Sequence, residues 1–192
     1  MAETTDSIHF SLFPTSLGEC GIAWRGETVI ATSLPEKSPQ ETARRLAAQT
    51  CGTEADPSPA IQRAIEAITT LLEGENTDLT FIDCDFSGLD DFAEKVYELA
   101  LTIPPGETLT YGDIASELGD KQLSRSVGQA LGRNPFPIIV PCHRVMGAGG
   151  KLTGFSANGG VSTKLKMLEI EGAEVAGPPS LFDDLPLAVK PG

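Results

Sequence analysis

The chain has 192 residues and a mass of 20.2 kDa, which suits one compact domain or two small ones. Its 40% apolar residues exclude wholesale disorder, and no apolar run is long enough to form a membrane-spanning helix. The net charge of −13, taken as a total, argues against a nucleic-acid partner.

The N-terminus and the cysteines indicate the cellular compartment. The first ten residues carry acids and no basic region, so we expect no secretory signal. The four cysteines are scattered and form no Cys-x-x-Cys pair, which favours neither a zinc site nor a disulfide framework. These observations predict a reduced, cytoplasmic protein without a bound metal.

Residues 1–85 carry the pattern of a small antiparallel sheet with helices. Segments rich in β-forming residues predict strands at 8–13, 20–26, 27–34 and 79–83. Ser38-Pro39, with an acidic residue three positions after the serine, predicts a helix start, and Ser58-Pro59 predicts a second. No group of side chains in this region suggests chemistry, so we expect a scaffold.

After a short break the chain becomes mostly helical. Phe92, Val96 and Leu99 recur at helical spacing and predict one apolar face. A helix that begins at Thr110, a polar turn and a helix over 122–132 fit a helix-turn-helix, and an ordinary αα-hairpin has the same spacing.

The segment 134–145 is apolar and rich in proline, which predicts a buried extended stretch from Ile138 to Val140. The glycines that follow predict a loop. A last helix over 162–171 is expected to turn Leu165 and Leu168 inward.

These elements predict an α/β (α+β) fold in two domains. Residues 1–87 form an N-terminal scaffold with a small antiparallel sheet and helices. Residues 88–175 form a mostly helical, winged-helix-like domain with the helix-turn-helix. Residues 176–192, rich in proline and without helical period, are expected to be a flexible tail.

The negative charge is unevenly distributed along the chain. Residues 1–90 hold 5 basic and 15 acidic residues, whereas residues 121–166 hold basic residues and no acid. The basic residues of that stretch are Lys121, Arg125, Arg133, Arg144, Lys151, Lys164 and Lys166. The stretch is either a chance gap in acids along a solvated face or the footprint of a polyanion, for which binding would be strongly salt-sensitive.

Cys142 and His143 form the pair most suited to chemistry. A thiolate is the reactive form of cysteine, and a basic neighbour favours it. Neighbours in an extended strand point to opposite faces, so proton transfer between them requires a bend or an intervening water. A third group should orient the imidazole, and spacing does not identify it. The alternative is that Cys142 is only a small core residue.

The run Pro141-Cys142-His143-Arg144-Val145 does not stand alone. Thr110-Tyr111-Gly112-Asp113-Ile114-Ala115, the helix and turn at 125–135, and the loop and helix at 154–172 follow the same order and spacing as in one known family. Together these segments resemble the O6-alkylguanine-DNA alkyltransferases, also called methylated-DNA–protein-cysteine methyltransferases. The resemblance covers residues 90–174, and the N-terminal half agrees only in its general pattern of sheet and helices.

The resemblance implies a role for each matching catalytic residue. Cys142 would accept the alkyl group, and His143 would take the thiol proton through a water. Glu171 would hold and polarise His143. Tyr111 would face the flipped base and donate a proton to the leaving guanine. Asn134 would tie the recognition helix to the reactive loop.

The same resemblance implies the residues that contact DNA. Arg125 would enter the base stack and fill the vacated space, while Ser126 and Gly128 let the helix approach the minor groove. Arg133 and Tyr111 would also contact DNA. The base pocket would be lined by Pro137, Val145, Phe155, Ser156, Gly159 and Gly160. Phe155 departs from the tyrosine of many members, so a hydroxyl contact there is absent.

The function implied is DNA repair by single-turnover transfer of a methyl or larger alkyl group from O6 of guanine to Cys142, after base flipping. Action on O4 of thymine is left open. The implied partner is double-stranded DNA with alkylated guanine, without any cofactor, and we expect a monomer.

Two alternatives from other functional classes remain. One is an alkyltransferase-like protein that binds lesions without transfer, against which the presence of Cys142 argues. The other is a thiol hydrolase that uses Cys142 and His143.

Overall fold

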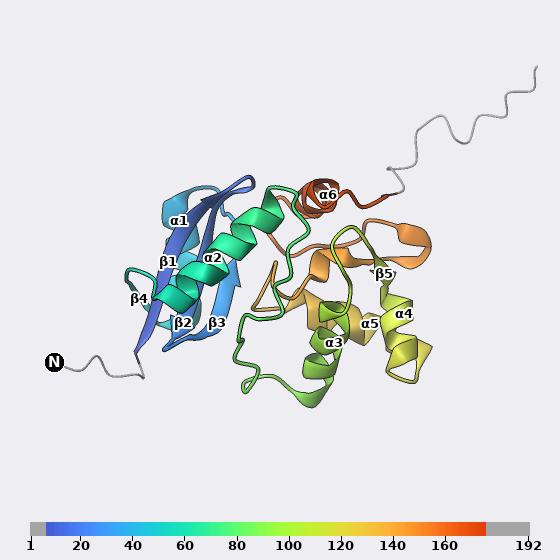
Figure 1. The fold of residues 1–192 in the computed structure, drawn as a ribbon. Coiled ribbons are helices and arrows are strands. Elements are labelled where there is room, and N and C mark those ends of the chain that lie inside the picture. The colour runs from blue at the N-terminus through green and yellow to red at the C-terminus, as the bar shows by residue number, and fades with distance from the viewer. Residues whose placement is uncertain (1–6, 176–192) are drawn as a thin grey trace, which may run out of the picture.

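The computed structural model describes residues 7–175, so the predicted tail at 176–192 lies outside the described residues. In Figure 1 a sheet with α1 and α2 lies on the left, α3, α4 and α5 lie on the right, and α6 lies above their junction. The elements are β1 (Ile8–Thr15), β2 (Gly18–Arg25), β3 (Thr28–Ser33), α1 (Pro39–Thr50), β4 (Thr53–Glu54), α2 (Pro59–Leu72), α3 (Asp91–Leu101), β5 (Leu109–Thr110), α4 (Tyr111–Glu117), α5 (Ser124–Gly132), β6 (Val145–Met146) and α6 (Val161–Ile170).

The sheet has the strand order β3-β2-β1-β4. The pairs β1–β2 and β2–β3 are antiparallel, as the sequence predicts, and Gly26 at φ 61° makes the tight turn between β2 and β3. The very short β4 joins β1 in parallel and was not predicted, because two residues carry no readable periodicity.

Two helices cover opposite faces of this sheet. Along β2, Ile22 and Trp24 belong to the cluster that contains the apolar residues of α2, whereas Ala23 packs in a second cluster with Leu46 of α1. A Cβ at Gly21 would lie 2.9 Å from the Leu46 side chain, so a larger residue there would force that side chain to shift. Because both faces are covered, the centre of β2 is buried throughout.

The strand predicted at 79–83 is wrong. Asp78 accepts hydrogen bonds from the backbone N–H and the hydroxyl of Thr80, which folds the segment into turns. Its end is connected to β3 by an isolated parallel bridge between Val29 and Cys84, in which the Val29 N–H donates to Asp83 and the Asp85 N–H donates to Val29. The apolar residues that suggested a β-strand therefore lie in a series of turns.

Helix α3 buries Val96 as predicted, but the centre of its buried face is shifted from the predicted one. Phe92 and Leu99 are only half-buried. The buried residues are Ala93, Val96, Tyr97 and Ala100. The Tyr97 hydroxyl donates to the carbonyl of Ala130 in α5 at 2.9 Å, and this helix contact selects the face.

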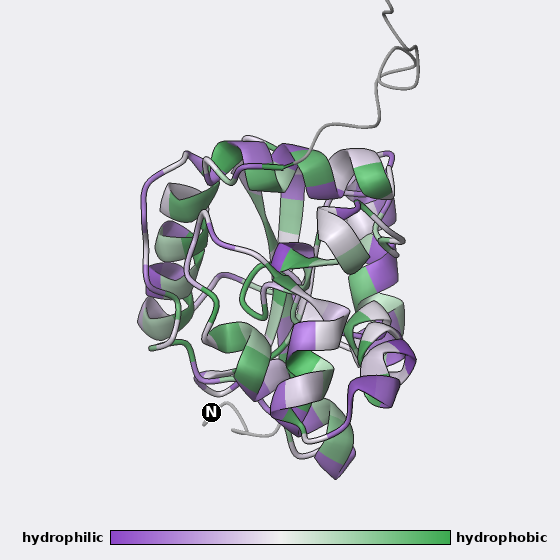
Figure 2. Ribbon diagram, turned by 90° about the vertical axis from the view of Figure 1, so that its right-hand side faces the viewer, coloured by the Kyte–Doolittle hydropathy of each residue, from purple (hydrophilic) through white to green (hydrophobic). Residues whose placement is uncertain are grey.

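The predicted helix-turn-helix is confirmed as α4 and α5, joined by a turn that includes the 3₁₀ segment Lys121–Leu123. Thr110 caps α4 and exchanges hydrogen bonds with Asp113 in a capping box. Figure 2 shows alternating hydrophobic and hydrophilic stripes on the helices, as expected for helices with one buried face.

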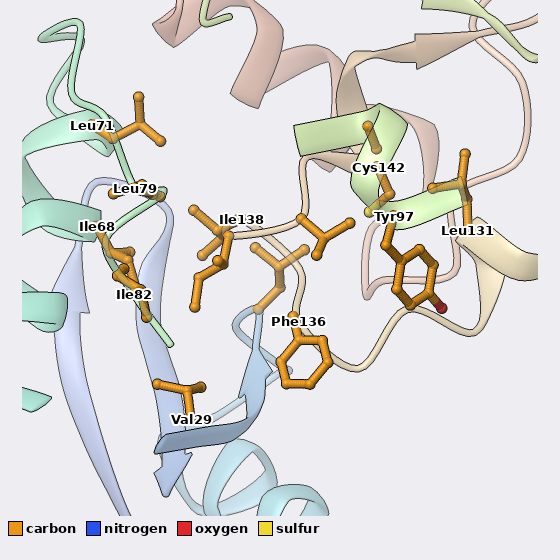
Figure 3. Close-up of a cluster of buried hydrophobic side chains, with 14 of the residues drawn as sticks. Val29, Ile68, Leu71, Leu79, Ile82, Tyr97, Leu131, Phe136, Ile138 and Cys142 are labelled. Atoms are coloured by element: carbon orange, nitrogen blue, oxygen red, sulfur yellow. The ribbon is translucent and has the colours of Figure 1, made fainter. Parts of the chain in front are cut away.

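The segment predicted as extended, Ile138–Val140, is buried but folds as a tight turn. Ile138 has φ 79°, and the N–H of Val140 donates to the carbonyl of Phe136 at 2.8 Å. In Figure 3, Phe136 and Ile138 lie between the side chains of the sheet side, such as Val29, and the region of Cys142. The side chains of this turn pack between the N-terminal sheet and the C-terminal helices and join them in one apolar core.

Candidate active site around Cys142

Cys142 begins a 3₁₀ turn, Cys142–Arg144, which comes shortly after the buried turn at 136–140 in the chain. The Arg144 N–H donates to the carbonyl of Pro141 at 2.9 Å, and the Val145 N–H to that of Cys142. Cys142 is only 8% exposed and His143 is fully buried. The extended geometry assumed for this pair is therefore wrong, because both residues lie in a 3₁₀ turn.

A buried charge network holds His143. Its Nε2 lies 2.8 Å from Oε1 of Glu171, the residue that ends α6. Arg144 donates to both oxygens of the same carboxylate, from Nε at 2.9 Å and from Nη2 at 2.8 Å. A third Arg144 bond reaches the carbonyl of Ile103 at 2.6 Å. The Glu171 side chain is 1% exposed, so bidentate pairing compensates a fully desolvated carboxylate.

The network sets the protonation states. Burial would raise the pKa of Glu171, but hydrogen bonds from His143 and Arg144, together with the Arg144 charge, lower it to about 2. Burial lowers the pKa of His143 and outweighs the carboxylate beside it. An ionised carboxylate only accepts, so Nε2 carries the proton and Nδ1 is the basic nitrogen. This Nδ1 is buried and has no hydrogen-bond partner within residues 7–175.

These shifts predict that stability falls on acidification. His143 stays neutral in the fold, whereas the unfolded chain binds a proton below its usual pKa of 6.5, so stability declines below that pH. The Glu171 contribution, about 3 kcal/mol for a pKa of about 2 in place of 4.5, is present above pH 4.5 and lost toward pH 2. Urea unfolding followed by Trp24 fluorescence from pH 7 to pH 3 measures this loss. A constant free energy of unfolding would contradict it.

Lys164 is a buried cation beside Cys142 that sequence reasoning left without a role. Its Nζ donates to the carbonyl of Val145 at 2.5 Å and lies 5.8 Å from the centre of the Tyr111 ring. Burial lowers its pKa to about 8. Burial also raises the pKa of the Cys142 thiol, while the Asn134 side chain and the Lys164 charge oppose that rise. The sequence signal for its burial was its helical spacing from Met167, three residues later on the same buried face of α6.

The burial of Arg144 and Lys164 corrects the interpretation of the basic stretch. Two of its cations neutralise or support buried groups and do not reach the surface. The exposed cations of the stretch are Lys121, Arg125, Arg133, Lys151 and Lys166.

Asn134 connects α5 to the reactive turn. Its Nδ2 donates to the carbonyl of Val140 at 2.9 Å, and its Oδ1 accepts from the N–H of Phe136 at 2.8 Å. These bonds close the turn at 136–140 and explain why the segment is not extended. They also link the end of α5 to the residues immediately before Cys142.

Tyr111 lies at the start of α4, close to the reactive turn. The short strands β5 and β6 pair in parallel, with Thr110 opposite Met146, which brings the start of α4 beside the chain that follows Cys142. A Cβ at Gly128 in α5 would lie 3.8 Å from the Tyr111 ring, so the two helices meet at this ring. Arg125 is exposed on the same helix as Gly128.

A pocket opens at Cys142. Three of the predicted pocket residues, Pro137, Phe155 and Ser156, line it, and Ser156 donates to the carbonyl of Gly132 at 3.0 Å. Val145, Gly159 and Gly160 were also predicted for the pocket but are not among its lining residues. The opposite wall comes from the N-terminal half, where no site residue was predicted: Thr32, Ser33, Leu34, Glu36, Arg45 and Gln49.

Within residues 7–175, no group of histidine, cysteine and acidic side chains has the arrangement of a metal site. In the same range, no helix has the length and apolar character to cross a membrane.

Comparison with known proteins identifies relatives that match most of the chain. Residues 91–173 match the family described as 6-O-methylguanine DNA methyltransferase, DNA binding domain. A methylated-DNA–protein-cysteine methyltransferase of Mycobacterium tuberculosis H37Rv is 36% identical over 92% of this chain and 99% of its own length. One of Methanothermobacter thermautotrophicus is 32% identical over 83% of this chain and 82% of its own.

Solved structures show the same fold. The crystal structure of Mycobacterium tuberculosis OGT in complex with DNA has a TM-score of 0.72 and 34% identity, covering 85% of this chain and 92% of that one. The O6-methylguanine-DNA methyltransferase of Pyrococcus kodakaraensis KOD1 has a TM-score of 0.66 and 26% identity, covering 86% and 99%. With relatives matched over nearly their whole length, the chain belongs to the methylated-DNA–protein-cysteine methyltransferase family.

Proposed function

We propose that this chain repairs DNA by moving a methyl or larger alkyl group from O6 of guanine to Cys142, once per protein molecule. The observation that carries the proposal is the polarised relay beside the thiol. Glu171 and Arg144 hold Nε2 of His143, and the unpartnered Nδ1 is left to act as a base next to a cysteine that lines a pocket.

The proposed reaction begins with the thiol proton, which passes through a water to Nδ1 of His143. Ionised Glu171 stabilises the imidazolium that forms, and the Lys164 charge favours the thiolate. The sulfur then attacks the alkyl carbon in line, a C–S bond forms, and the bond from that carbon to guanine O6 breaks. Tyr111 donates a proton to the departing guanine, and the proton taken up by His143 passes through water to restore the Tyr111 phenol. The thioether product is stable to water, so the protein is consumed, and no cofactor takes part.

For DNA binding, we propose that α5 enters the minor groove of duplex DNA that contains alkylated guanine. Exposed Arg125 would fill the space left by the extruded nucleotide, with Ser126, Gly128 and Arg133 at the same interface. Residues 88–175 would carry these contacts, and residues 1–87 would support them. We further propose that the protein acts as a monomer in the cytoplasm.

A mass measurement tests the transfer. Incubation with duplex DNA that carries one O6-methylguanine should add the mass of one methylene to the peptide that contains Cys142, with no second turnover.

Cys142→Ser should lower the transfer rate by more than about 10³-fold, because an alcohol lacks the thiolate nucleophile. Cys51→Ser, at an exposed cysteine on the sheet side, is the matched control and should react normally. Binding without a mass change would favour a lesion-binding protein, and repeated turnover a thiol hydrolase.

A further inference from the structure

Strand β3 lies at the edge of the sheet, so one side of it has no strand partner. Other segments bind that side. At its start, the Val29 N–H donates to the carbonyl of Asp83 at 2.8 Å. At its end, the Thr32 N–H donates to the carbonyl of Pro135 at 2.9 Å. The edge of the N-terminal sheet therefore docks directly on the segment that precedes the reactive turn.

Thr32 makes a second bond to the same segment. Its hydroxyl donates to the carbonyl of Pro137 at 2.7 Å, and the residue is only 4% exposed. Pro135 and Pro137 have no N–H, so their carbonyl oxygens are the backbone groups available to hold them. Within the segment, the Phe136 N–H donates to Oδ1 of Asn134. The Asn134 N–H donates to the Leu131 carbonyl of α5 at 3.2 Å, so the segment 134–137 is bonded to α5 at its start and to β3 at Pro135 and Pro137.

The Pro137 carbonyl belongs to the peptide unit that leads into Ile138, whose φ is 79°. A β-branched residue adopts such a φ only where its surroundings hold it there. The Thr32 hydroxyl fixes the orientation of this peptide plane and hence one end of the strained turn. Pro137 and Thr32 also line the pocket that contains Cys142.

From this geometry, and resting on the function proposed above, we propose that Thr32 is a positioning residue for alkyl transfer. Through the Pro137 carbonyl it holds the pocket wall and the turn that presents Cys142. The N-terminal half then contributes to the reaction geometry in addition to supporting the fold.

Thr32→Val tests this, because valine keeps the shape and strand preference and removes only the hydroxyl. We expect the transfer rate at saturating substrate to fall about tenfold, the worth of one buried hydrogen bond. The fall should be equal with methylated duplex and with free O6-benzylguanine, since both substrates occupy the same pocket. Thr32→Ser, which retains the hydroxyl, should restore the rate.

Thr28→Val is the matched control on the same strand. Its hydroxyl donates to Asp83 Oδ2 at 2.7 Å, and neither residue lines the pocket at Cys142. Because this bond is exposed, Thr28→Val should lower the midpoint of thermal unfolding less than Thr32→Val does, and it should leave the transfer rate unchanged. Equal rates for the two valine variants, or a Thr32→Ser variant as slow as Thr32→Val, would overturn the role of Thr32 and leave the proposed function intact. An inactive wild-type chain would overturn both.

Discussion

Glu171→Gln is expected to remove most of the alkyl transfer and to destabilise the fold together. The amide keeps the volume of the carboxylate but carries no charge and accepts with one oxygen only. Arg144, 6% exposed, then becomes a buried cation without its partner, which costs about 3–5 kcal/mol of unfolding free energy. His143 loses the charge that stabilises its imidazolium, and the transfer rate should fall on the order of 10²–10³-fold.

Two measurements separate these effects. Urea unfolding reports the loss of stability, and the rate of methyl uptake is compared at a temperature where circular dichroism shows both proteins folded. Glu169→Gln removes the same charge from an exposed position on the same helix and should change neither quantity appreciably. A Glu171→Gln variant as active as Glu169→Gln would exclude the relay through His143.

Arg125→Ala is expected to slow repair of duplex DNA on the order of 10²-fold, because extruding a paired nucleotide costs a few kcal/mol that an inserted side chain offsets. The reaction with free O6-benzylguanine requires no extrusion and should keep its rate. Arg125 is exposed on α5 and is not among the buried residues of that helix. The substitution should therefore not change the stability of the fold.

The control for charge is Arg63→Ala, which removes an exposed arginine from α2 in the N-terminal half. It removes one positive charge, as Arg125→Ala does, and should leave duplex repair almost unchanged. Arg125→Ala, in contrast, should also reduce the salt dependence of DNA binding. An equal loss of rate on duplex and free base would contradict the proposed insertion of Arg125.

Local signals explain most of the elements that were predicted correctly. The caps at Ser38, Ser58 and Thr110 each act on residues within three positions, so the bonds that begin these helices are readable along the chain. The predicted strand at 79–83 failed because apolar composition does not distinguish a pleat from turns that an Asx contact closes. The extended stretch Ile138–Val140 failed because the side chain of Asn134 determines its course.

The site divides in the same way. Cys142 and His143 were singled out by their chemistry and Glu171 by the family resemblance. The structure joins His143 and Glu171 by a hydrogen bond and places Cys142 in the same turn as His143. The burial of Lys164 and Arg144 could not be predicted from the charge pattern. That pattern gives the number of cations in a stretch but not which of them face the core.

By itself, the sequence determined the caps, the helix-turn-helix and the antiparallel hairpins, and it singled out Cys142 and His143 as the candidate reactive pair. These depend on side-chain type and short spacing, which physical chemistry makes local. Only the tertiary structure decided the pocket, because its walls come from both halves of the chain. The bond from Thr32 to Pro137 joins residues separated by 105 positions, and no periodicity in a sequence encodes the edge at which a sheet meets a distant turn.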